Sequence, residues 1–341
     1  MPTEAIEFRV NDDTLRGDLF RPEGVLQPPL VVMAHGFGLE RRFGLPAFAE
    51  RLRAAGLAVL LFDYRGFGDS GGTPRGLVDA RRHLADFAAA VRCARELKGV
   101  DSTRVALWGT SFAGGHVLET AARLPGISAV VAQVPHVDGL ASLLLYPPQL
   151  LPGAVWLALF DLAAGALGRD PVRVPIIGHS GVRCLAGQDC ADGYRHLIPE
   201  GAVWQEAVPA RILLTILGYR PIHVVHRIQA PVLIIAAERD SLIPFAATRR
   251  TAARIRSCQF EALPIGHFDL YDGPWFEKSV ALQIDFLRRH LGAGCETGAI
   301  ESGGRNNSAR QPCSTIHCQG VKQQVRSSID RHGLHQGNPS G

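Results

Sequence analysis

Ser111 stands in the segment of the chain with the clearest chemical signature, Trp108-Gly109-Thr110-Ser111-Phe112-Ala113-Gly114-Gly115. An apolar run of strand length precedes it, and residues 116–123 are typical of a helix. A serine at a sharp turn from strand to helix has a strained backbone and an exposed hydroxyl, and the helix N-terminus offers N–H groups to a developing anion. The usual pattern is G-x-S-x-G, and Ala113 in the last position is still small. The pattern predicts that Ser111 is a nucleophile, against the alternative of a glycine-rich turn that only caps a helix.

A serine hydroxyl becomes a good nucleophile only when a base removes its proton. His267 follows the last apolar run of the chain by a few residues, and Gly266 allows a close approach. We therefore predict that His267 is the base. His83 and His290 lie in predicted helices, where we expect them to be exposed to solvent.

The base in turn needs a carboxylate that orients it. Asp240 follows the apolar run 231–236 and precedes a predicted helix, and the resulting chain order Ser111, Asp240, His267 is the one expected for such a sheet. Asp138 is the alternative, because it also follows an apolar run of strand length. We favour Asp240, whose own alternative role is an ion pair with Arg239.

Backbone N–H groups that stabilise an oxyanion are predicted at two turns. The segment Ala34-His35-Gly36-Phe37-Gly38 ends an early apolar run, and Phe112 directly follows the predicted nucleophile. The N–H groups of Phe37 and Phe112 are therefore the expected donors. His35 is expected to brace its loop.

Two other motifs are not expected to carry chemistry. Gly178-His179-Ser180-Gly181 has the appearance of a nucleophile motif, but the residues after it do not indicate a helix, so Ser180 is not predicted to be the nucleophile. The segment Cys313–Cys318 holds only three soft ligands, so we predict no zinc site there.

The elements that must position these residues alternate between strands and helices. An antiparallel hairpin is expected over 6–20, and the later strands are apolar throughout, as is typical of strands buried on both faces. The pattern predicts an α/β fold with a doubly wound, mostly parallel sheet. The expected parallel strands are 30–34, 57–62, 105–107, 129–134, 231–236 and 258–263, and the expected helices are 46–55, 78–98, 116–123, 245–255 and 276–290.

The alternation stops between 136 and 228, where proline, glycine and leucine are frequent. We predict that these residues form a cap inserted between two parts of the core, 1–135 and 229–292. Residues 293–341 contain no aromatic residue and are rich in Ser, Gly, Gln, Asn and Arg, so we expect a disordered tail.

Composition limits the classes of function. The 341 residues are 46% hydrophobic and 20% charged, with a formal net charge of +4, and no basic run interleaved with aromatic residues indicates a nucleic-acid partner. Seven cysteines, an odd number, fit free thiols, and no secretory signal is visible, so we expect a cytoplasmic protein.

In the apolar stretch 140–168, three prolines and Asp161 interrupt the run, so we expect helical pieces packed on the protein and no stable membrane span.

Together these motifs resemble the α/β-hydrolase superfamily over residues 15–291. The resemblance rests on His35-Gly36-Phe37, on the loop 63–70, and on the segments around Ser111, Asp240 and His267. In the superfamily the loop that resembles 63–70 braces the nucleophile turn. The segments 108–118 and 266–271 and the Phe276-Glu277-Lys278 tripeptide are similar to a bacterial branch that includes dienelactone hydrolases and X-Pro dipeptidyl-peptidase-like esterases.

The expected function is hydrolysis of a carboxylic ester through an acyl-enzyme, with no cofactor and no metal. A small-molecule ester with an apolar group is the expected substrate, because the cap contains Leu143, Leu144, Leu145, Trp156, Leu157 and Phe160. Thioesterase, acyltransferase and peptidase activities share the same intermediate and are alternatives. A non-catalytic binding protein on the same fold is the alternative from another class.

Overall fold

The computed structural model describes residues 3–292, so the expectations for the 293–341 tail and the Cys313–Cys318 segment lie outside the described residues. An eight-stranded sheet forms the centre, in the order β1-β2-β4-β3-β5-β6-β9-β10. Its strands are β1 (Glu4–Val10), β2 (Asp13–Phe20), β3 (Pro29–Ala34), β4 (Ala58–Phe62), β5 (Asp101–Thr110), β6 (Ala129–Gln133), β9 (Val232–Ala237) and β10 (Cys258–Leu263).

The pairing of the strands follows from their sequence patterns. β1 and β2 form the predicted antiparallel hairpin, and β2 also pairs antiparallel with β4. From β4 to β10 all neighbours are parallel. Every residue of β3, β4, β6 and β9 is buried, which is why these strands are apolar without alternation, apart from Gln133 at the end of β6. The α/β fold with a mostly parallel sheet is confirmed.

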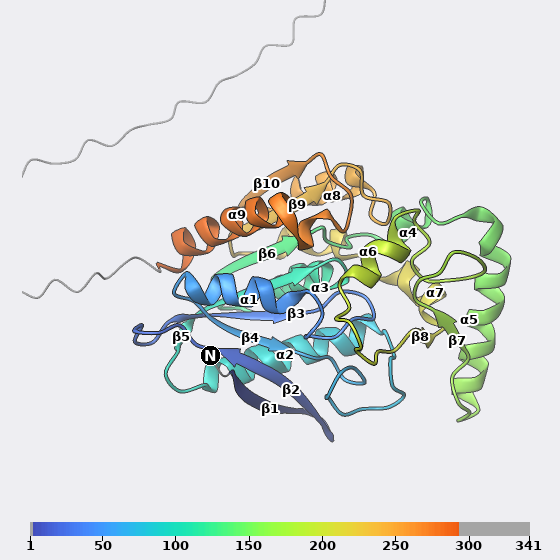
Figure 1. Ribbon diagram of the computed structural model, residues 1–341, viewed down its shortest axis with the longest axis horizontal. Helices are drawn as coiled ribbons and strands as arrows, with labels where there is room; N and C mark the ends of the chain where they lie inside the picture. Colours follow the sequence, from blue (N-terminus) through green and yellow to red (C-terminus); the bar gives the residue numbers. More distant parts are fainter. Residues whose placement is uncertain (1–2, 293–341) are drawn as a thin grey trace, which may run out of the picture. The chain divides into compact units, whose positions relative to one another are not determined.

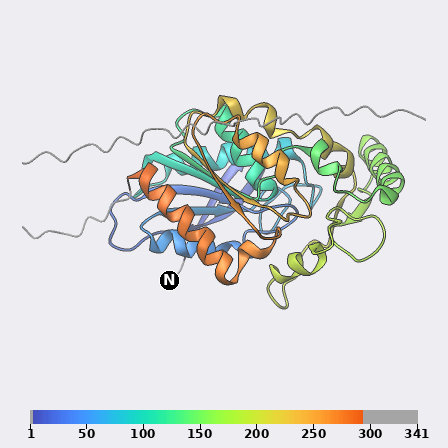
Figure 2. The ribbon, with the colours of Figure 1, turned by 90° about the horizontal axis from the view of Figure 1, so that it is seen from above.

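Helices cover both faces of the sheet (Figures 1 and 2). On one face α1 (Leu45–Ala54) lies beside α9 (Gly273–Leu291), and on the other α2 (Ala80–Glu96) lies beside α3 (Phe112–Arg123). A fifth helix, α8 (Phe245–Ala252), packs against β9 and β10.

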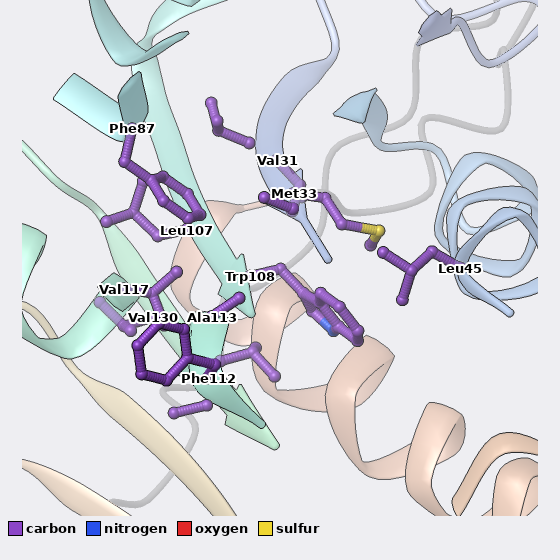
Figure 3. Packing of buried hydrophobic residues seen from close by; sticks show 14 of the residues in the cluster. Val31, Met33, Leu45, Phe87, Leu107, Trp108, Phe112, Ala113, Val117 and Val130 are labelled. Carbon is purple, nitrogen blue, oxygen red and sulfur yellow. The ribbon is translucent and has the colours of Figure 1, made fainter. Parts of the chain in front are cut away.

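Strand β5 shows how the two halves of the core are built. Leu107 lies beside Phe87 of α2, whereas Trp108 turns the opposite way, toward Met33 and Leu45 (Figure 3). The Trp108 indole N–H donates a hydrogen bond of 2.6 Å to the Gln283 side-chain oxygen in α9. All of these side chains are buried, so the strand that leads to Ser111 is held from both faces.

Residues 136–228 contribute no strand to the eight-stranded sheet, and they lie beyond the edge at which its parallel strands end (Figure 1). A small antiparallel sheet of β7 and β8 within them was not predicted, because strands of three residues leave no periodic pattern. The elements of this cap are α4 (Gly139–Leu143), α5 (Leu151–Ala166), β7 (Arg173–Pro175), α6 (Cys190–His196), β8 (Ala207–Pro209) and α7 (Ile212–Thr215).

The expectation that the apolar stretch 140–168 packs on the protein holds for only one face of α5. Within residues 3–292, Pro148–Ala166 is the helix long and apolar enough to cross a membrane by length and composition, and only 17% of its most apolar part is buried. The prolines do not interrupt it because they stand at its start, where proline is tolerated. Asp161, the one charged residue of α5, is buried and pairs with Arg211 at 2.6 Å. The helix therefore buries Asp161 together with the small residues Ala154 and Ala158, whereas its large side chains Trp156, Leu159 and Phe160 are mostly exposed.

Candidate active site

Ser111 occupies the turn between β5 and α3 with a left-handed backbone conformation, φ 56° and ψ −120°. This conformation is strained for a residue other than glycine. The glycines around it allow the turn to close, because a Cβ at Gly109 would lie 2.3 Å from the Ala113 carbonyl oxygen. Ala113 itself is buried, so the small side chain in the unusual last position of the motif is accommodated.

Three loops bring the predicted side chains into one hydrogen-bonded chain. His267 Nε2 lies 3.0 Å from Ser111 Oγ, and His267 Nδ1 lies 2.7 Å from Asp240 Oδ2. An ionised carboxylate can only accept, so Nδ1 carries the proton and donates to Asp240, and Nε2 is left to accept from the serine hydroxyl. The side chains of His267 and Asp240 are only 2% and 3% exposed, which shields the pair from water.

The two candidate aspartates for the orienting role have different partners. The second oxygen of Asp240 accepts hydrogen bonds from the N–H groups of Leu242 and Ile243, which fix the carboxylate. Asp138 instead caps α4 and forms a two-pronged ion pair with Arg220, at 2.7 and 3.0 Å. The predicted alternative to Asp240 is thus engaged elsewhere.

Phe37 and Phe112, the predicted oxyanion donors, belong to the two loops that meet at Ser111. Both line the same cavity as Ser111, and their rings meet edge to face with centroids 5.7 Å apart. Phe112 is the first residue of α3, so its N–H has no partner within the helix. The loop of Phe37 approaches closely, since a Cβ at Gly36 would lie 3.2 Å from Ser111 Cβ.

The loop 63–70 forms contacts expected of a brace. The Ser70 hydroxyl donates to the Asp63 carbonyl at 2.8 Å, and the Arg41 backbone N–H donates to the Asp63 carboxylate at 2.7 Å. His35 is buried beside this carboxylate, as expected for a loop-bracing residue. Ser180 is exposed in a loop with no helix directly after it, and it does not line the cavity.

A cavity of about 310 Å³ opens at Ser111. Its walls come from the loops after β3, β5, β6 and β9 and from the cap. Of the six cap residues predicted to form an apolar pocket, Leu143 and Leu145 line it. The other four, Leu144, Trp156, Leu157 and Phe160, do not, and all of these except Leu157 are mostly exposed. Other apolar residues of the cap also line the cavity and were not predicted individually. They include Leu151, Ala154, Val155, Ile212, Leu213, Leu214, Ile216 and Leu217.

The structure also corrects the expectation that His83 is solvated. His83 is 1% exposed, stacks on Tyr64 at 4.0 Å, and contacts His116. His116 in turn shares a 2.7 Å hydrogen bond with the Tyr219 hydroxyl, and Tyr219 stacks on His136 in the cavity wall. His136 follows β6, as Asp138 does, and ligands of open α/β sheets bind at the edge where the parallel strands end. This position after β6 is the signal in the sequence that could have identified His136 as a residue of the site.

Because these histidines are buried, we expect the protein to become less stable toward unfolding in acid. Burial lowers the pKa of His83 and His116 well below 6.5, and that of His136 to about 4. Below 6.5 the unfolded chain therefore binds more protons than the native one. We expect the free energy of unfolding to fall, as the pH drops from 6.5 toward 4, by up to ~1.4 kcal/mol per pH unit for each of these histidines.

Urea titrations at neutral and acidic pH measure this loss. His136→Phe should reduce the loss between the two pH values, because phenylalanine takes up no proton. His226→Phe, at an exposed position, is the matched control and should leave the loss unchanged. An identical pH dependence in wild type and His136→Phe would contradict the assignment.

A family described as "Alpha/beta hydrolase family" matches residues 31–276. A quorum-quenching protein, AidA, from Acinetobacter baumannii is 43% identical over 83% of this chain and 94% of its own length.

Two fungal proteins are more distant. The polyketide transferase grgF from Penicillium is 28% identical over 85% of this chain and 98% of its own length. The crystal structure of GrgF superimposes with a TM-score of 0.75, at 27% identity, over 86% of this chain and all of that one. A thiohydrolase from Eupenicillium brefeldianum is 26% identical over 86% of this chain and 96% of its own length.

Proposed function

The chain belongs to the alpha/beta hydrolase family, and we propose that it cleaves a carboxylic ester through an acyl-enzyme formed on Ser111. The observation that carries the proposal is the hydrogen-bonded chain from Ser111 through His267 to Asp240 at the wall of an apolar cavity. Hydrolase or acyl-transfer chemistry also agrees with the names of the thiohydrolase and the polyketide transferase.

In the proposed reaction, Ser111 Oγ attacks the ester carbonyl carbon while His267 Nε2 takes the hydroxyl proton. Asp240 holds the imidazole in the tautomer that the attack requires and stabilises the imidazolium. The N–H groups of Phe37 and Phe112 stabilise the oxyanion. His267 then returns the proton to the leaving alcohol, and a water activated by the same imidazole releases the acid.

The apolar walls of the cavity favour an apolar acyl group. Burial of each methylene contributes about 0.8 kcal/mol, so kcat/KM for p-nitrophenyl esters should rise up to about fourfold per added methylene until the cavity is filled. Ala154 lines the cavity, and Ala154→Trp should shift the preference toward shorter chains. Ala163→Trp, at an exposed position of the same helix, is the control. A kcat/KM that does not change with chain length would count against an apolar acyl pocket.

Thioester hydrolysis or acyl transfer is the second candidate, favoured by the names of the polyketide transferase and the thiohydrolase. Both reactions begin with the same attack by Ser111, and they differ in the leaving group and in the acceptor. Matched esters and thioesters with and without an alcohol or amine acceptor, followed by mass spectrometry of the products, separate the two candidates.

The resemblance to dienelactone hydrolases and X-Pro dipeptidyl-peptidase-like esterases stays a prediction, and it adds lactones and X-Pro peptides to the substrates to test. The name of the Acinetobacter relative gives priority to bacterial signal molecules that carry an ester or lactone bond. If no substrate is cleaved and a fluorophosphonate probe does not label Ser111, a binding protein without catalysis is the better account.

A further inference from the structure

Two polar side chains in the cavity wall have no partner in the part of the chain that the structure describes. They are His136, through Nε2, and Ser142, through Oγ, and both atoms are shielded from solvent. A buried donor or acceptor without a partner is costly, and native proteins pair nearly all of them.

Other polar side chains of the same wall are satisfied by the protein. The Tyr146 hydroxyl donates to the Arg183 carbonyl at 2.9 Å, and the Ser241 hydroxyl donates to the Asp189 carboxylate. Ser111 is engaged with His267. The unpaired atoms of His136 and Ser142 are therefore not a general property of the cavity.

His136 is held next to the nucleophile by several contacts. Its backbone N–H donates to the Ser111 carbonyl at 2.9 Å, just after Val134, whose φ of 37° is strained for a β-branched residue. Its ring lies parallel to Tyr219 with centroids 5.9 Å apart, and it is 6% exposed. These contacts hold His136 beside the backbone of Ser111, and both residues line the same cavity.

The imidazole of His136 stays neutral at physiological pH, because burial lowers its pKa to about 4. A neutral imidazole has one donor and one acceptor, and a serine hydroxyl can also act as both. Most other residues of the cavity wall are apolar. A ligand group that pairs with these two side chains must itself form hydrogen bonds.

We propose that His136 and Ser142 form a polar subsite that binds a second hydrogen-bonding group of the acyl chain, beyond the carbonyl that Ser111 attacks. The substrates are then acyl groups that are apolar over most of their length but carry a keto, hydroxyl or amide group near the scissile bond. This inference rests on the proposed function, because attack by Ser111 places the acyl group in this cavity.

The test uses p-nitrophenyl esters of equal chain length. One is the heptanoate, and the others carry an amide at three positions along the chain: N-butanoylglycine, N-propanoyl-β-alanine and N-acetyl-γ-aminobutyrate. We expect His136→Phe to lower kcat/KM for at least one amide ester about 10- to 100-fold more than for the heptanoate. The comparison of variant with wild type removes differences in intrinsic reactivity between the esters.

In His136→Phe, phenylalanine keeps the aromatic stack on Tyr219, and an unchanged rate of fluorophosphonate labelling of Ser111 shows that this variant is folded. Two further variants separate hydrogen bonding to the substrate from packing. Ser142→Ala should also weaken the preference for the amide ester. His136→Gln, which keeps a donor and an acceptor, should restore part of it.

Binding of the free acids to Ser111→Ala, measured by calorimetry, is independent of catalysis. We expect the N-acylated amino acid that matches the preferred ester to bind more tightly than heptanoic acid, and His136→Phe to remove this difference. An equal loss of kcat/KM for all four esters, with no difference in binding of the acids, would overturn the subsite. Absence of both cleavage and labelling in the wild type would instead overturn the proposed function.

Discussion

Ser111→Ala is expected to lower turnover by about 10⁴- to 10⁶-fold, a loss of roughly 5–8 kcal/mol of transition-state stabilisation. The substitution removes the only atom of this residue that can attack a carbonyl and leaves the Cβ that the turn already accommodates. The measurement is kcat for the best ester of the chain-length series, with purified protein.

The loss of turnover in Ser111→Ala must be separated from a loss of folding. Urea unfolding should give a free energy close to that of the wild type, because the hydroxyl contacts only His267 among the side-chain hydrogen bonds of the described residues. Ser180→Ala should leave turnover unchanged, since Ser180 lies outside the cavity. Turnover that survives Ser111→Ala would refute the acyl-enzyme.

Asp240→Asn is expected to lower kcat by about 10⁴-fold. Asparagine can donate from its amide group toward Nδ1, which favours the tautomer with the proton on Nε2. In that tautomer Nε2 cannot accept the proton of Ser111. The change keeps the size of the side chain, so the effect is measured on kcat with the fold preserved.

Asp138→Asn is the matched control, with the same chemical change on the other candidate. Asp138 pairs with Arg220 and caps α4, so this variant should lose stability by about 1–3 kcal/mol while kcat changes less than about tenfold. If Asp138→Asn lowered kcat far more than Asp240→Asn, the assignment of the orienting acid would be wrong.

Local patterns were sufficient for the order of the core elements along the chain and for the type of fold. Apolar runs such as those of β3 and β9 predict buried parallel strands because both faces of each strand are covered. The ends were less well predicted. For β5 only 105–107 was expected, whereas the strand spans Asp101–Thr110, because its first residues are polar and partly exposed.

Other features could not be read from local patterns. The same leucine-rich composition describes Leu143, which lines the cavity, and Leu144, which is 84% exposed. The burial of His83 depends on Tyr64 and His116, which are distant in the sequence. In α5, the long apolar run predicted burial, but Asp161 and two alanines are buried while Trp156 and Phe160 are mostly exposed.

That Ser111, Asp240 and His267 lie close together was predictable from the sequence, because each one follows a strand of a parallel sheet, and such strands end at one edge. Only the tertiary structure decided that Asp240, and not Asp138, lies against the imidazole, because Arg220 comes from a distant segment to occupy Asp138. The cavity and the unpaired atoms of His136 and Ser142 likewise depend on how the cap meets the sheet edge. Periodicity reports which face of an element is buried, but not which distant segment covers it.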